Sequence, residues 1–235
     1  RAGRTYTERY GSGPFGPGFP ATHTPTLWGS RVGDRLSGAM PLLTDADGHA
    51  SIFYYGGFLQ PETKLYRNGE LVSSSEFFGW RGDVPAEAAD YRLESSVTGG
   101  FGGLSTQVRS VFTFRSAHTD PTKPTKLPLS AVRYTPTLDG DNAAPAGTTF
   151  TIPVTVQRQP GAPAHAVTTL TVDVSYDDGR TWQPATLKRV AGTTWTATVT
   201  HPGTAGFASL RAKSTDTAGN SVDQTILRAY RTSNP

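Results

Sequence analysis

Residues 167–182, Val-Thr-Thr-Leu-Thr-Val-Asp-Val-Ser-Tyr-Asp-Asp-Gly-Arg-Thr-Trp, carry the two signals that decide the fold class of this chain. The first ten residues are rich in Val and Thr, as β-strands are. The last eight match the turn pattern Ser-x-Asp-x-Gly-x-Thr-Trp, in which aspartate hydrogen-bonds turn amides, glycine takes a positive φ and tryptophan packs under the hairpin. The stretch predicts a strand that ends in a tight turn, with Ser175, Asp177, Gly179 and Trp182 as structural residues.

This turn pattern also has a functional interpretation, because sialidase-like propellers repeat it once per blade. The chain holds a single copy, so the structural interpretation is favoured. A second turn is predicted at Asp216-Thr-Ala-Gly-Asn220, where Asp216 and Asn220 supply the turn chemistry.

Other short segments with strand character surround these turns. The strongest hairpin signal is Asn68-Gly69 within residues 64–72, between alternating apolar positions. The remaining candidates are residues 50–55, 91–97, 105–114, 149–156, 193–200, 206–213 and 222–230. Pro153 should make its segment an edge strand or one that switches sheets. With 26 Gly, 18 Pro and no helical periodicity, the chain is predicted to be all-β.

A length of 235 residues fits two sandwiches of about a hundred residues each. Residues 117–128 contain three prolines and no apolar periodicity, which indicates a stiff connection. We therefore expect two tandem β-sandwich domains, 1–126 and 127–235, the second immunoglobulin-like or fibronectin-type-III-like. Residues 1–26 should form an extended Gly/Pro-rich arm that packs its aromatic residues, Tyr6, Tyr10, Phe15 and Phe19, against a sheet.

Two surface sites are candidates. Phe77, Phe78 and Trp80 lie in a Ser/Gly/Asp-rich loop after the hairpin, and we expect an exposed aromatic patch there. Asp139, Asp141 and Asn142 offer oxygens for calcium, but the spaced ligands of a calcium loop do not follow, so turn formation is the favoured interpretation. Apart from this calcium alternative, no metal or cofactor is expected.

The chemistry-bearing residues do not form a catalytic pattern. The chain has no Cys, its five His form no metal-binding pair, and no Gly-x-Ser-x-Gly occurs. The net charge of +3 is scattered, so no nucleic-acid partner is expected. No apolar run is long enough to span a membrane, and the start at Arg1 lacks a signal-peptide pattern, which favours a mature or processed fragment.

Six motifs occur in an order that resembles the C-terminal region of large secreted bacterial subtilisin-like serine peptidases. The resemblance covers about residues 60–235, and the motifs are Leu65-Tyr-Arg-Asn-Gly-Glu-Leu71, Ala89-Asp-Tyr-Arg-Leu-Glu94, Phe112-Thr-Phe-Arg-Ser116, Pro128-Leu-Ser-Ala-Val-Arg-Tyr134, Ser175–Trp182 and Ser214–Asn220. It implies immunoglobulin-like or fibronectin-like sandwiches that follow a peptidase domain, and an extracellular location.

The resemblance carries over no catalytic residue, because the family's Asp-Thr/Ser-Gly, His-Gly-Thr and Gly-Thr-Ser-Met-Ala motifs are absent. It implies that the parent is an endopeptidase and that this chain is its non-catalytic accessory module, with its own peptidase domain or a protein substrate as partner. The alternatives are a carbohydrate- or protein-binding module that uses the aromatic cluster at 77–80, and a free-standing peptidase inhibitor.

Overall fold

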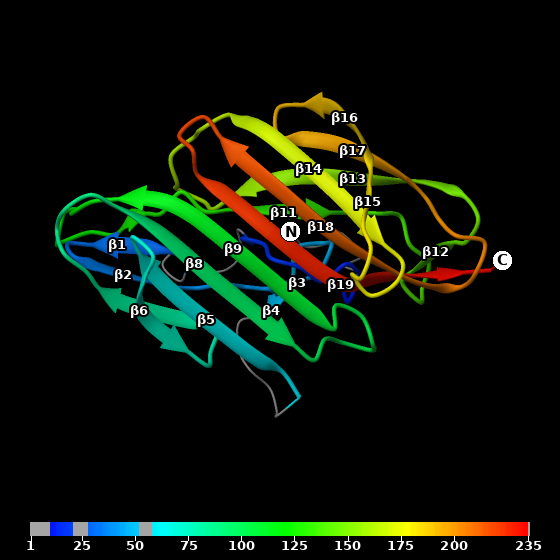
Figure 1. The fold of residues 1–235 in the computed structure, drawn as a ribbon, viewed down its shortest axis with the longest axis horizontal. Coiled ribbons are helices and arrows are strands. Elements are labelled where there is room, and N and C mark those ends of the chain that lie inside the picture. The colour runs from blue at the N-terminus through cyan, green and yellow to red at the C-terminus, as the bar shows by residue number, and fades with distance from the viewer. Residues whose placement is uncertain (1–9, 21–27, 52–57, 235) are drawn as a thin grey trace, which may run out of the picture.

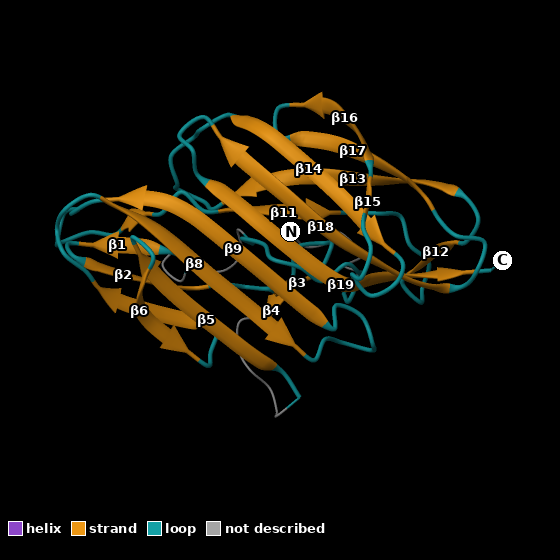
Figure 2. Ribbon diagram, viewed as in Figure 1, coloured by secondary structure: helices purple, strands orange, loops and turns teal. Residues whose placement is uncertain are grey.

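The chain folds into two layers of β-strands in a computed structural model that describes residues 10–20, 28–51 and 58–234 (Figure 1). These residues contain strands and loops and no helix, as Figure 2 shows, so none of them forms a helix that could cross a membrane. The all-β prediction is confirmed. The candidate strand at residues 50–55 falls mostly at 52–57, outside the described residues.

One layer is a single sheet of nine strands that runs through both halves of the chain. Eight of its strands follow the order β15-β14-β18-β19-β9-β8-β5-β6, and β12 pairs with β19 in parallel. Their bounds are β5 Gln60–Arg67, β6 Glu70–Ser75, β8 Ala89–Thr98, β9 Gln107–Ser116, β12 Ala143–Pro145, β14 Val167–Ser175, β15 Gln183–Pro184, β18 Gly206–Asp216 and β19 Ser221–Ser233.

The other layer consists of two four-stranded sheets and a short hairpin. The first-half sheet has the order β10-β1-β2-β7, with β1 Ser30–Val32, β2 Arg35–Ala39, β7 Gly79–Asp83 and β10 Thr125–Lys126. The second-half sheet has the order β11-β13-β17-β16, with β11 Ser130–Tyr134, β13 Thr149–Arg158, β16 Thr186–Ala191 and β17 Thr194–Thr200. The hairpin is β3 Leu43–Thr44 with β4 Ala50–Ser51.

The second half has the strand order of an immunoglobulin sandwich. If β11 is strand A, then β13, β17 and β16 are B, E and D, which gives the ABED sheet of that fold. The facing strands β14, β18 and β19 are C, F and G, β15 extends the sheet beyond C, and β12 continues strand A across to G. The expectation of an immunoglobulin-like second half is confirmed by this pairing.

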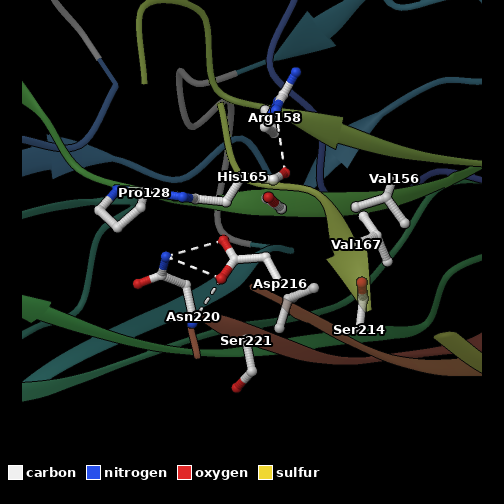
Figure 3. A pocket seen from close by; sticks show the side chains of 11 residues that line it. Pro128, Val156, Arg158, His165, Val167, Ser214, Asp216, Asn220 and Ser221 are labelled. Atoms are coloured by element: carbon white, nitrogen blue, oxygen red, sulfur yellow. Dashed lines mark hydrogen bonds between the residues drawn. The ribbon is translucent and has the colours of Figure 1, made fainter. Parts of the chain in front are cut away.

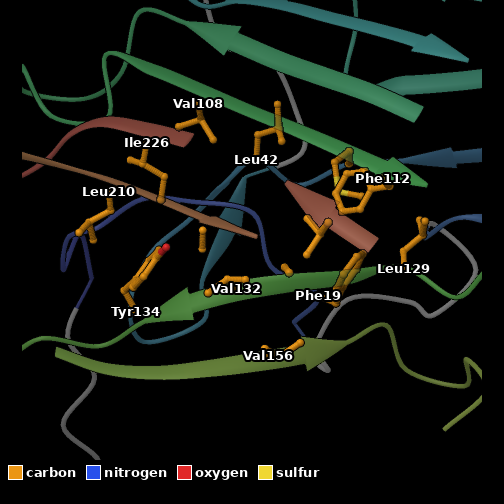
Figure 4. Packing of buried hydrophobic residues seen from close by; sticks show 14 of the residues in the cluster. Phe19, Leu42, Val108, Phe112, Leu129, Val132, Tyr134, Val156, Leu210 and Ile226 are labelled. Carbon is orange, nitrogen blue, oxygen red and sulfur yellow. The ribbon is translucent and has the colours of Figure 1, made fainter. Parts of the chain in front are cut away.

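The two halves are joined by strand pairing as well as by the chain connection. Strand β19 pairs with β9 in antiparallel register from Ser221↔Thr113 to Leu227↔Gln107, and then pairs with β12 from residue 231. Arg228, with φ of 53°, lies between these two pairings. The buried side chains of both halves form one hydrophobic cluster, part of which appears in Figure 4. The domain boundary near residue 126 stays a prediction, and a continuous sheet and core cross it.

The connection at residues 117–128 is ordered against the first half. Thr125 and Lys126 pair with Arg31 and Ser30 of β1, and the amide of Thr119 donates to the carbonyl of Gly33. The proline-rich sequence predicted a stiff connection, which stays a prediction, and gave no sign that the segment supplies an edge strand.

Local turn chemistry follows the sequence closely. Asn68 and Gly69 have φ of 49° and 90° between β5 and β6, the pair of positive angles that a two-residue type I′ turn requires. Pro153 pairs with Thr196 of β17 on one side of β13. On the other side, the regular pairing with β11 stops at Tyr134↔Val154, next to Pro153, so its missing N–H interrupts no ladder there. Its carbonyl still accepts from the amide of Thr135. The strand is thus an edge toward β11 only in its first half.

The arm at residues 10–20 runs between the layers, and residues 12–20 are buried except for half-buried Phe15. Phe19 is 1% exposed and belongs to the common core (Figure 4). Phe15 packs edge-on to Phe101, whereas Tyr10 stays 68% exposed beside His49. The predicted packing of the arm is confirmed for Phe15 and Phe19; Tyr6 lies outside the described residues.

Candidate functional site

The turn after β14 is closed by hydrogen bonds among its own residues. Thr181 donates to Asp177 through its amide (2.9 Å) and its hydroxyl (2.6 Å), and Ser175 Oγ donates to the same carboxylate at 2.7 Å. The bond from the Thr181 hydroxyl is the largest cause that lowers the pKa of Asp177 to about 2. Gly179 has φ of 83°, and its carbonyl accepts from Trp182 Nε1 at 3.0 Å. The predicted turn is confirmed, and both oxygens of the Asp177 carboxylate accept hydrogen bonds within it.

Asp216 and Asn220 close the hairpin between β18 and β19. Asp216 Oδ1 accepts from the amides of Ala218 (2.9 Å) and Asn220 (3.0 Å), and Asn220 Nδ2 donates to Asp216 Oδ2 at 2.9 Å. These groups line a small pocket with His165, Ser214 and Ser221 (Figure 3). The pocket encloses about 10 Å³, room for one water, and the carboxylate faces Asn220 rather than an imidazole.

The calcium candidates serve the loop and the arm. Asp139 Oδ1 accepts from the amides of Asp141 (2.9 Å) and Ala143 (2.8 Å). Asn142 accepts from the amide of Gly13 at 2.7 Å and donates to the carbonyl of Gly11 at 3.1 Å. Among the described residues no group of three or more His, Cys, Asp or Glu is placed to hold a metal ion. Calcium binding stays a prediction without added support.

The expected exposed aromatic patch at 77–80 is wrong in two of its three members. Phe77 is 66% exposed, but Phe78 and Trp80 are 4% and 5% exposed. The segment continues β2–β7 pairing, with the amide of Met40 donating to the carbonyl of Phe78, so alternate side chains point inward. A strand periodicity of two separates Phe77 from its neighbours and removes the planar platform.

The outer face of the nine-stranded sheet carries many polar and charged side chains. Opposite residues in antiparallel strands share a face. One row across six strands is Lys64, Glu94, Val111, Asp223, Lys213 and Thr171, and the next is Glu62, Ser96, Arg109, Thr225, Arg211 and Asp173. Charges of both signs are therefore mixed along rows that extend over both halves. We call this surface the outer face.

A shallow cleft of about 290 Å³ lies on the outer face where β14, β18 and β19 meet. Arg211, Lys213, Asp173 and Asp223 line it, and Arg211 Nε donates to Asp173 at 2.8 Å. Arg211 also stacks on Trp182, 4.8 Å from the ring. The open position and mixed charge of this cleft suit contact with a polar macromolecular surface more than enclosure of a small molecule.

The ends of the outer face carry aromatic rings covered by arginine. Arg92 lies 3.8 Å over the Tyr66 ring at the β5 end, and Arg211 covers Trp182 at the other. Both rings are half-buried. A sugar would have to displace a guanidinium to stack on either ring, which weighs against a carbohydrate platform here.

An aspartate–histidine pair lies in a separate cleft of about 500 Å³ at the first-half sheet. His118 Nδ1 is 2.9 Å from Asp34 Oδ1, and the fully buried Arg31 donates to the same oxygen at 3.1 Å. The His118 hydrogen bond is the main cause that lowers the pKa of Asp34. The residues lining this cleft include no Ser, Thr or Cys.

Sequence reasoning missed both surfaces, because their members are far apart along the chain. Asp34 and His118 are separated by 84 residues, and the outer face depends on the β9–β19 pairing. The only local signal was the alternation of each strand, which does not identify its neighbour.

Comparison with known proteins gives little further information. No family model and no curated protein matches the chain. Among solved structures, it is similar to a chimeric titin Z1Z2-Z1Z2 tandem functionalised with a GRGDS peptide from fibronectin, at 17% identity, 82% coverage of this chain, 89% of that chain and a TM-score of 0.25. A score this low does not define a shared fold, so the immunoglobulin-like assignment rests on the strand pairing. That fold is consistent with a non-enzymatic domain.

Proposed function

We propose that the chain is a non-catalytic accessory module of a secreted, extracellular subtilisin-like serine endopeptidase. The support is the ordered set of six motifs, whose members occupy structural positions. Tyr91 and Phe114, from two of the motifs, stack at 5.6 Å between β8 and β9, and the two Asp-centred motifs form hairpin turns. Motifs that build a scaffold fit a module that supports a peptidase located elsewhere.

The outer face supports a mode of action in which the module contacts another protein. The β9–β19 pairing holds its charge rows in one register across both halves, which gives a broad, preformed and polar surface. Surfaces of this kind contribute orientation and encounter rate more than tight affinity. We infer that the module engages large protein substrates, or its own peptidase domain, through this face.

The first test compares the peptidase with and without residues 1–235. Cleavage of a folded protein and of a short chromogenic peptide should be measured side by side, together with the yield of active enzyme. We expect the loss of the module to lower cleavage of the protein or the yield, and to leave cleavage of the peptide intact per active enzyme. Equal yield and equal activity on both substrates would overturn the proposal.

The second test addresses the outer face. Arg109→Glu with Lys213→Glu reverses two cations on it, and Lys123→Glu with Lys188→Glu reverses two exposed cations away from it, as the control with the same change in net charge. We expect the outer-face variant to raise the KM for the protein substrate about tenfold and the control to leave it unchanged. Equal effects of both variants would point to net charge rather than to this face.

Other functions have less support. A sugar-binding role through residues 77–80 conflicts with the burial of Phe78 and Trp80. The inhibitor hypothesis would need an exposed loop that enters a peptidase, and the sequence marks none.

A further inference from the structure

The arm at residues 10–20 lies in a slot formed by residues 41–46, 105, 133, 142 and 157, which hydrogen-bond to the backbone of most of its residues. Gln157 accepts from the amide of Phe19 at 3.0 Å and donates to its carbonyl at 3.1 Å, so one side chain replaces a strand partner. Asn142 does the same for the amide of Gly13 and the carbonyl of Gly11. Gly16 exchanges two backbone hydrogen bonds with Thr44, at 3.0 and 2.9 Å.

A buried arginine completes the slot. Arg133 Nη1 donates to the carbonyls of Gly16 (3.3 Å), Pro17 (3.1 Å) and Thr44 (3.1 Å), and Nη2 donates to the carbonyl of Asp45. The side chain is bound by carbonyl oxygens rather than by a carboxylate. Burial lowers the pKa of Arg133 to about 10, which still leaves the guanidinium charged at neutral pH. Hydrogen bonds from this charged donor to peptide carbonyls are stronger than those between neutral groups.

The slot also selects side chains. A Cβ on Gly16 would lie 2.6 Å from Ile226 Cδ1, and one on Gly18 would lie 3.0 Å from Thr44 and 3.1 Å from Arg133 Nη1. Phe19 is buried in the core and Phe15 packs on Phe101. The accepted sequence is therefore an extended Gly/Pro-rich peptide with phenylalanine at these two spacings.

We propose that this slot is a peptide-binding site, that the arm is its resident ligand, and that the arm of a second copy of this chain can occupy it. The contacts come from one continuous segment, and its walls come from residues 41–46, 105, 133, 142 and 157, which do not depend on the arm's covalent attachment. A tethered arm has an effective concentration of about millimolar, so exchange becomes visible only when the resident arm is weakened. Exchange of an identical element between copies is a low-cost route to a dimer.

The test uses the full chain with Gly16→Val and Gly18→Val, which alters the arm and leaves the walls intact. A fluorescent peptide with the sequence of residues 10–20 should bind this variant at least about tenfold more tightly than the unaltered chain, whose own arm competes. The same peptide carrying both valines is the matched control and should not bind. Adding Gln157→Leu to the variant should weaken binding about tenfold by removing the Phe19 contacts.

If the variant does not fold alone, refolding with the unaltered peptide should restore its folded yield, and the valine peptide should not. Absence of both binding and restoration would overturn the proposal, because the arm would then be core of its own chain only.

The proposal that the arm of a second copy can occupy the slot has a separate test. The arm variant is mixed with a chain that has an intact arm and Gln157→Leu in its slot. A mixed dimer by size-exclusion light scattering is expected, and two monomers would overturn this part of the proposal even if the peptide binds.

Discussion

The turn at residues 175–182 and the slot both satisfy backbone polar groups through side-chain hydrogen bonds, but the partners lie at very different distances along the chain. In the turn, Asp177 accepts from Thr181, four residues away, and Gly179 N donates to Ser175 Oγ. In the slot, Gln157 satisfies Phe19 across 138 residues, and Arg133 satisfies Gly16 across 117. The turn folds from local information, whereas the slot exists only when both halves have come together. We therefore expect loss of a slot residue to affect the whole molecule, and loss of a turn residue to affect one hairpin.

The largest effect is expected for Arg133→Met. The substitution keeps the length of the side chain but removes the hydrogen bonds that Arg133 donates to the buried carbonyls of Gly16, Pro17 and Thr44, of which Gly16 and Thr44 keep their backbone donors. A hydrogen bond to a charged group contributes about 1.5 to 3 kcal/mol, so loss of the four that Arg133 donates should cost more unfolding free energy than either of the other two substitutions. Urea denaturation monitored by tryptophan fluorescence measures it, and Arg109→Met on the outer face is the control. A cost as small as that of the control would contradict the assigned role of the slot.

A smaller loss is expected for Gln157→Leu. The apolar side chain has similar volume but leaves the amide and the carbonyl of Phe19 unpaired, at about 1 to 3 kcal/mol for each buried group. Because the arm contacts both halves, we also expect a less cooperative transition, seen as a lower urea m-value. An unchanged m-value would show that the arm does not couple the halves.

The smallest effect is expected for Asp177→Asn, and it should depend on pH. The folded-state pKa of Asp177, about 2, lies below the ordinary value. The ionised carboxylate therefore stabilises the fold above about pH 4, and this contribution is lost as the pH falls toward 2. The difference in thermal midpoint between the unaltered chain and the variant should be present at pH 6 and shrink below pH 4. A difference that is constant from pH 6 to pH 2 would mean that charge is not the cause.

The comparison also explains what could be predicted from sequence. Asn68-Gly69 and Asp216–Asn220 specify their turns through their own φ angles and side-chain bonds, so both were predicted correctly. Trp80 was misplaced because an aromatic residue in a Gly-rich stretch gives no sign of which strand face it occupies. The β9–β19 pairing was missed for another reason: many alternating segments are compatible partners, and only the folded topology selects one.

The Asp-centred turns differ in the same way from the outer face and the slot. The Asp-centred turns were found because each is a short, contiguous pattern. The outer face and the slot depend on Arg109, Arg133 and Gln157. Arg109 and Gln157 stand in ordinary strand sequence, and the motif at 128–134 that contains Arg133 gives no sign of its partners. Their significance comes from residues more than a hundred positions away.

The antiparallel pairing of β9 with β19 has a consequence for solubility. A fragment beginning at residue 127 would keep all strands of the immunoglobulin-like half, but residues 221–227 of its last strand would present their backbone N–H and C=O groups to solvent. Such an uncovered strand is a template for intermolecular pairing and aggregation. In the whole chain, β9 of the first half covers this edge of β19. The two halves should therefore be expressed together.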